Sequence, residues 1–202
     1  MSSFERESQL FAAARDNQVA KIKELLSRDD VDVNWGNPQD NQRTTLQVAS
    51  ERGHVDSVLS LLSHPRIDPN RRDRTGETPF LRACFNGSAD LVKVLLGDPR
   101  VDVNIASTMR CSPLWWLACN GHAECTRWLI ASGKDLAMAG GENWLDGDHG
   151  KKYMPVDIAR RRGKTAIVNL LEEFVEDPDK CTSEIRRLLC LNGTIAIFII
   201  II

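Results

Sequence analysis

Three residues with metal-binding side chains lie close together in the middle of the chain. Cys119, His122 and Cys125 are spaced three residues apart, and Cys111 lies nearby. Zinc takes four nitrogen or sulfur ligands in tetrahedral geometry, so this spacing would allow a zinc site. A structural role is the alternative, because free cysteine packs as a small apolar side chain and His122 follows a glycine at an expected turn between helices. We favour the structural role and expect neither a bound metal nor a cofactor.

Catalytic chemistry is not indicated by the remaining titratable residues. The histidines are His54, His64, His122 and His149, and none has a partner in a recognised motif. The sequence contains no GxSxG elbow, P-loop, GxGxxG or HExxH pattern. We therefore predict no catalytic residue, no enzymatic activity and no small-molecule substrate.

The composition is that of a foldable protein with balanced charge. Hydrophobic residues make up 42% and charged residues 27% of the 202 residues, and the net charge is −2. This balance does not favour nucleic acid as a partner. The six cysteines form no CxxC pair, and residues 1–7 lack the pattern of a secretion signal. We expect free thiols and a cytoplasmic location, with the nucleus as the alternative.

An internal repeat positions all of these residues. Residues 44–49 recur at 78–83 and 112–117, and in diluted form at 154–159. A glycine follows each copy, and the spacings between these glycines are 34, 34 and 42 residues. Residues 7–34 fit the same frame more loosely. About five units in one register indicate a repeat protein.

Each part of the unit has a physical role. Thr78 and Ser112 precede prolines, as is typical of a helix start, since the hydroxyl caps free amide groups and proline suits the first helical turn. The glycine then permits a tight reversal, and a second helix follows with leucines on one face. The unit closes in a hairpin-like loop with Asn34, Asn70 or Asn104, a residue type that tolerates left-handed backbone geometry. No unit can bury its apolar face alone, so stacking is required.

These motifs resemble ankyrin repeats. The match is best over residues 71–104, good over 35–70 and 105–139, and looser over 7–34 and 140–178. The resemblance implies an all-α fold, an α-solenoid of about five stacked helix pairs with protruding hairpin-like loops. One departure is the histidine of the family's Thr-Pro-Leu-His motif, which puts the usual hydrogen-bond ladder along the first helices in question. Its positions here hold Gln47, Leu81, Trp115 and Asp157.

The chain is expected to divide into three parts. Residues 1–178 form the array, with a polar insertion at 140–150, and residues 179–191 form a C-terminal capping helix with Ile185, Leu188 and Leu189 on one face. Residues 192–202 form an apolar tail. At about 1.5 Å per helical residue, this tail is too short to span a membrane core of about 30 Å. It could be an aggregation-prone strand or a peptide that docks in a hydrophobic groove.

The resemblance implies that a protein partner binds the concave face, which consists of loop tips and first helices. The arginines of segment 71–74 would suit an acidic partner segment, although a solvated loop is the alternative. Trp115 and Trp116 either fill gaps between repeats or, for Trp116, anchor the partner. Carried over position by position, the partner-binding residues are Arg43, Glu51, Arg52, Arg72, Arg74, Glu77, Phe85, Asn86, Met109, Trp116, Asn120, Trp144, Tyr153 and Arg161.

The function expected is therefore that of a non-catalytic protein-binding scaffold or adaptor. The alternative is a membrane-associated or self-assembling protein that acts through its apolar C-terminal tail. Deleting residues 194–202 would distinguish the two, because only the second function depends on the tail.

Overall fold

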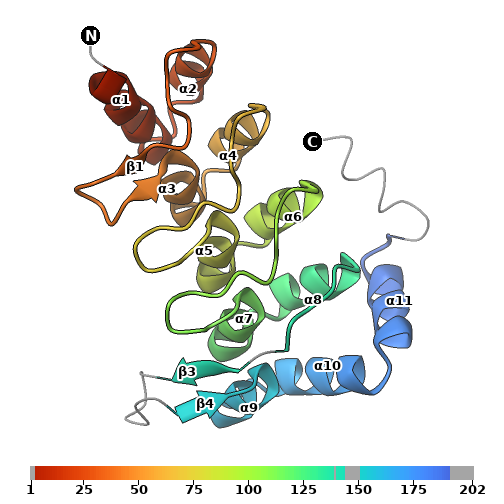
Figure 1. The fold of residues 1–202 in the computed structure, drawn as a ribbon. Helices are drawn as coiled ribbons and strands as arrows, with labels where there is room; N and C mark the ends of the chain where they lie inside the picture. Colours follow the sequence, from red (N-terminus) through yellow and green to blue (C-terminus); the bar gives the residue numbers. More distant parts are fainter. Residues whose placement is uncertain (1–2, 139, 144–150, 192–202) are drawn as a thin grey trace.

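The computed structural model describes residues 3–138, 140–143 and 151–191. Two rows of helices run side by side along a curved stack, and each inner helix is followed by its outer partner (Figure 1). The inner row consists of α1 (Ser3–Arg15), α3 (Thr45–Arg52), α5 (Pro79–Asn86), α7 (Pro113–Asn120) and α9 (Pro155–Arg161). The outer row consists of α2 (Val19–Leu26), α4 (Val55–Leu62), α6 (Ala89–Gly97), α8 (Ala123–Ala131) and α10 (Thr165–Glu176). The predicted all-α solenoid is confirmed.

Short hairpins protrude from the inner side of the stack. Strand β1 (Gly36–Asn37) pairs antiparallel with β2 (Arg43–Thr44), and β3 (Gly141–Asn143) pairs with β4 (Lys151–Tyr153). Backbone hydrogen bonds also join the loop tips of adjacent repeats. The Arg74 amide donates to the Asn41 carbonyl at 2.9 Å, and the Thr108 amide donates to the Thr75 carbonyl at 2.9 Å. Adjacent tips are therefore held in a fixed spacing.

The inner helices begin where the sequence predicted. The hydroxyls of Thr44, Thr78 and Ser112 each accept a hydrogen bond from the backbone amide three residues later. Pro79 and Pro113 occupy the first turn, where a missing amide hydrogen costs nothing. These caps set the first residue of each inner helix and so the direction in which its side chains point.

The asparagines that close each unit join neighbouring repeats through their side chains. None of Asn34, Asn70 and Asn104 has a left-handed backbone. Instead, Nδ2 of Asn34 donates to the Arg66 carbonyl at 2.7 Å, and Oδ1 accepts the Asp68 amide at 2.7 Å. Asn70 and Asn104 form the same pair of bonds with the loops that follow them. A carboxamide carries both a donor and an acceptor, which is what this pairing between repeats requires.

The C-terminal end of the stack is covered by α11 (Pro178–Leu188), which packs against α8 and α10. Cys181 and Ile185 are buried there. Leu188 was expected to share their face, but it is 69% exposed, because the buried positions follow a spacing of four from Cys181. Among the described residues, no helix has the length and apolarity needed to cross a membrane.

Candidate partner-binding surface

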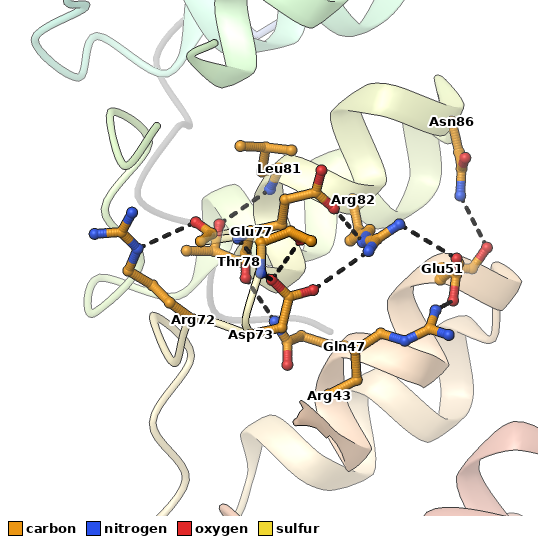
Figure 2. A network of polar contacts seen from close by, with 12 residues as sticks. Arg43, Gln47, Glu51, Arg72, Asp73, Glu77, Thr78, Leu81, Arg82 and Asn86 are labelled. Atoms are coloured by element: carbon orange, nitrogen blue, oxygen red, sulfur yellow. Dashed lines mark hydrogen bonds and ion pairs between the residues drawn. The ribbon is translucent and has the colours of Figure 1, made fainter. Parts of the chain in front are cut away.

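A network of charged side chains covers the inner surface between α3 and α5 (Figure 2). Arg82 of α5 lies at its centre, with its guanidinium 3.4 Å from Glu51, 3.3 Å from Asp73 and 2.6 Å from Glu77. Arg43 binds Glu51 from the other side. The sequence analysis named Arg43, Glu51 and Glu77 but missed Arg82. The only feature of the sequence that pointed to Arg82 was its position between two apolar residues of a short inner helix.

The Asp73 side chain is the most firmly held member of this network. It is fully buried, and Oδ1 accepts hydrogen bonds from the Thr75 amide, the Thr75 hydroxyl and the Glu77 amide. A buried carboxylate needs such donors to offset its desolvation. The loop tip at 73–77 is therefore built around one carboxylate, and Arg82 ties that loop to α5.

Two residues at the family's histidine position still join neighbouring repeats. Nε2 of Gln47 donates to the Glu77 carbonyl at 2.6 Å, and Nε1 of Trp115 donates to the Tyr153 carbonyl at 3.0 Å. Both acceptors immediately precede the next helix start. The ladder that we had questioned is thus present at these two steps through an amide and an indole. Leu81 has no polar side-chain atom and cannot contribute.

Several predicted binding residues form bonds between repeats. Nδ2 of Asn86 donates to the Glu51 carbonyl at 2.9 Å, and Nδ2 of Asn120 donates to the Phe85 carbonyl at 2.9 Å. Arg72 donates to the backbone of its own loop and to Ala106 in the next one. These contacts give all three side chains a structural role. Their contribution to partner binding remains a prediction.

An aromatic cluster lies at the centre of the inner surface. Trp115 and Trp116 are 1% and 5% exposed, and their rings meet edge-on with centroids 5.0 Å apart. Phe85 packs edge-on against Trp116 at 4.7 Å and is 40% exposed. Trp116, which was predicted as a possible partner anchor, is buried by its neighbours, and its contribution to partner binding stays a prediction. Phe85 is the accessible member of the cluster.

Exposed arginines also lie on this side of the molecule. Five carboxylates of the loops and inner helices, those of Asp40, Glu51, Asp73, Glu77 and Asp157, are held in ion pairs with other arginines. In contrast, Arg52, Arg74 and Arg110 are exposed and their side chains contact no hydrogen-bond acceptor or carboxylate in the described part of the chain. These three side chains are therefore available to an acidic ligand.

The far end of the surface is formed by the fifth repeat. Lys151 and Arg161 lie over the Tyr153 ring, at 5.4 and 5.5 Å from its centroid. A hollow of about 500 Å³ opens beside Tyr153, between the loops of the last two repeats. Met109 is half-buried in the fourth loop. Trp144, another predicted binding residue, lies outside the described residues.

Five of the six cysteines are buried, and Cys190 is exposed. Cys84, Cys119 and Cys125 are among the buried ones. Burial raises the pKa of the Cys125 thiol to about 11 and raises that of Cys84 well above its ordinary value. Both are therefore protonated thiols at physiological pH in this structure. Among the described residues, no three histidine, cysteine or acidic side chains gather as a metal site.

Replacing Glu77 with glutamine is expected to change the pH dependence of stability. Burial raises the pKa of the Glu77 carboxyl above its ordinary value of 4.5, although Arg82 opposes this shift. The folded protein therefore binds this proton more tightly than the unfolded chain does. As the pH rises from the pKa of the unfolded chain to that of the folded protein, Glu77 lowers the stability of the fold increasingly. The stability of Glu77→Gln relative to the parent should rise as the pH increases from below 4.5, the ordinary pKa of the carboxyl, to above its raised pKa in the folded protein.

Urea unfolding at several pH values measures this difference. Glu176→Gln, at the exposed end of α10, is a control for the loss of a surface charge. A stability difference between Glu77→Gln and the parent that stays flat, or falls with rising pH, would show that Arg82 outweighs the effect of burial.

Comparison with known families agrees with this architecture. A family model described as ankyrin repeats (many copies) matches residues 46–96, and one described as ankyrin repeats (3 copies) matches residues 80–182. The chain belongs to the ankyrin-repeat family. The members of this family are generally protein–protein interaction modules and are typically non-catalytic.

Proposed function

We propose that this protein is a scaffold or adaptor that binds an acidic segment of another protein through its inner surface. A large apolar side chain of that segment would rest on Phe85, and its carboxylates would pair with Arg52, Arg74 or Arg110. The observation that carries the proposal is the 40% exposed Phe85 ring supported by the buried Trp116. Aromatic side chains held in this way supply much of the binding energy at protein interfaces.

The rigidity of the surface supports the same function. The ion pairs of Arg82 and the backbone bonds between loop tips hold the inner surface in one arrangement before a partner arrives. A preordered surface loses less conformational entropy on binding. The exposed arginines would accelerate association with an acidic segment, and this acceleration should weaken as salt is added.

Phe85→Ala is expected to weaken partner binding by about tenfold or more. The full chain serves as bait in a cell lysate, and partners are identified by mass spectrometry and then titrated as purified proteins. Val175→Ala is the matched control, because Val175 is 61% exposed on α10, away from the inner surface. Circular dichroism verifies that both variants are folded. Undiminished affinity of Phe85→Ala for the partners of the parent would place binding elsewhere.

A further inference from the structure

An apolar groove lies on the opposite side of the stack from the inner surface. It runs over α4, α6 and α8 with a volume of about 770 Å³. Its apolar lining comes from three successive outer helices and from the residue that follows α11. These lining residues are Leu59, Leu62, Val94, Leu96, Trp128 and Leu191. A space of this size is comparable to that of a ligand-binding site.

The cationic side chains around the groove already have contacts within the chain. Lys93 pairs with Asp90 and lies over the Trp128 ring at 4.9 Å. Arg100 pairs with Asp98, and Lys134 donates to a backbone carbonyl at 2.8 Å. An anionic ligand would have to compete with these contacts. The groove is therefore better suited to an apolar occupant.

The end of α11 directs the chain to this groove. The Leu191 amide donates to the Arg186 carbonyl at 2.8 Å, the Cys190 amide donates to the Arg187 carbonyl at 3.1 Å, and Cys190 is left-handed with φ 57°. This is the Schellman arrangement that ends a helix and turns the chain away from its axis. Leu191 is buried against Ile185 and lines the groove.

The segment that follows Leu191 is apolar, as is the lining of the groove. Seven of the nine residues of Thr194–Ile202 are isoleucine or phenylalanine, and β-branched residues favour an extended backbone. At about 3.3 Å per extended residue, residues 192–202 could reach roughly 36 Å. Neighbouring helices lie about 10 Å apart, so this length suffices to pass from α8 to α4.

We propose that residues 194–202 dock in this groove within the same molecule and cover its apolar lining. The covalent connection at Leu191 gives the segment an effective concentration in the millimolar range, above that of a second molecule at micromolar concentration. Docking removes two apolar surfaces from water together, whereas each would otherwise favour aggregation. The C-terminal segment is then part of the folded array and is not a membrane anchor.

Photocrosslinking of the full chain tests this assignment. Phe198 is replaced by the photoreactive amino acid p-benzoylphenylalanine, and crosslinked peptides are mapped by mass spectrometry across a range of protein concentrations. The expected crosslinks join the tail to segments 59–63, 93–100 or 128–134 of the same molecule, with a yield independent of concentration. This map locates the tail without any change to the groove itself.

Two further leucine variants of the photoreactive protein test whether the groove holds the tail. Leu62→Gln should lower the ratio of docked to undocked tail by about tenfold, because it removes apolar contact area. Leu188→Gln changes a leucine that is 69% exposed on α11 and does not line the groove, so it should leave the ratio unchanged. Crosslinks between molecules that increase with concentration would show self-assembly and overturn the proposal. So would crosslinks to added phosphatidylcholine vesicles in place of the groove, or crosslinks to the inner surface.

Discussion

Replacing Trp115 with alanine is expected to lower the free energy of unfolding by about 3–5 kcal/mol. Trp115 is the largest of the fully buried side chains, and it lies between the fourth and fifth repeats. The substitution leaves a cavity beside Trp116, whose ring centroid is 5.0 Å away. It also removes the indole donor of the 3.0 Å hydrogen bond to the Tyr153 carbonyl. Both losses affect the same interface, between α7 and α9.

Trp115→Phe separates the two contributions. Phenylalanine retains much of the volume but cannot donate the hydrogen bond, so we expect a cost of about 1–3 kcal/mol. Urea unfolding followed by circular dichroism measures both variants. Trp35→Ala is the matched control, since Trp35 is only partly buried at the other end of the stack. If Trp115→Ala costs no more than Trp35→Ala, the interface between α7 and α9 is not a major source of stability.

The loss of local stability caused by Trp115→Ala should differ along the chain. In a repeat array each unit is stabilised mainly by its neighbours, so loss of one interface releases the units beyond it. We expect amide hydrogen exchange to accelerate most in α9, α10 and α11. Protection in α1 to α4 should stay close to that of the parent protein.

The second large effect is expected for Gly87→Ala, which should lower the free energy of unfolding by about 2–4 kcal/mol. Gly87 ends α5 with φ 69°, in the left-handed region that disfavours a Cβ atom. A Cβ atom there would lie 2.3 Å from the His122 ring. That ring donates from Nε2 to the Phe85 carbonyl at 3.1 Å. Moving it aside would weaken a bond between the third and fourth repeats.

Gly53 is the matched control for this substitution. It ends α3 with φ 79°, but a Cβ atom there would have no neighbour within 4 Å. Gly53→Ala should therefore cost only about 1–2 kcal/mol, from the backbone conformation alone. The measurement is the unfolding free energy of the two variants under identical conditions. Equal costs would mean that the His122 ring moves freely and that backbone strain accounts for both effects.

The repeat pattern predicted much of this fold because it depends on local chemistry. Thr44, Thr78 and Ser112 cap helices through bonds that span three residues, and Gly53 and Gly87 reverse the chain through their own backbone angles. Such features are encoded within a few neighbouring residues. The number of helix pairs and their order therefore follow from the spacing of these residues.

The roles of individual polar side chains could not be predicted in the same way. Asn70 resembles a loop residue in the sequence, yet its carboxamide joins two repeats. The sequence analysis did not identify Arg82, although this side chain binds three carboxylates contributed by two repeats. Phe85 and Trp116 were equal candidates until the structure showed that only Phe85 is accessible. Each of these roles depends on at least one contact with a residue about thirty positions away, or on burial by a neighbouring unit.

The sequence by itself determined the repeat unit, the starts of the inner helices and the family, because caps, turns and apolar periodicity act over one or two helical turns. Only the tertiary structure decided which side chains remain available for a partner. The curved stack buries Trp116, pairs Asp73 and Glu77 with Arg82, and leaves Phe85 and three arginines exposed. It also brings Leu191 to the groove over α4, α6 and α8. Exposure and pairing are properties of the assembled surface, and they arise only when the repeats stack against one another.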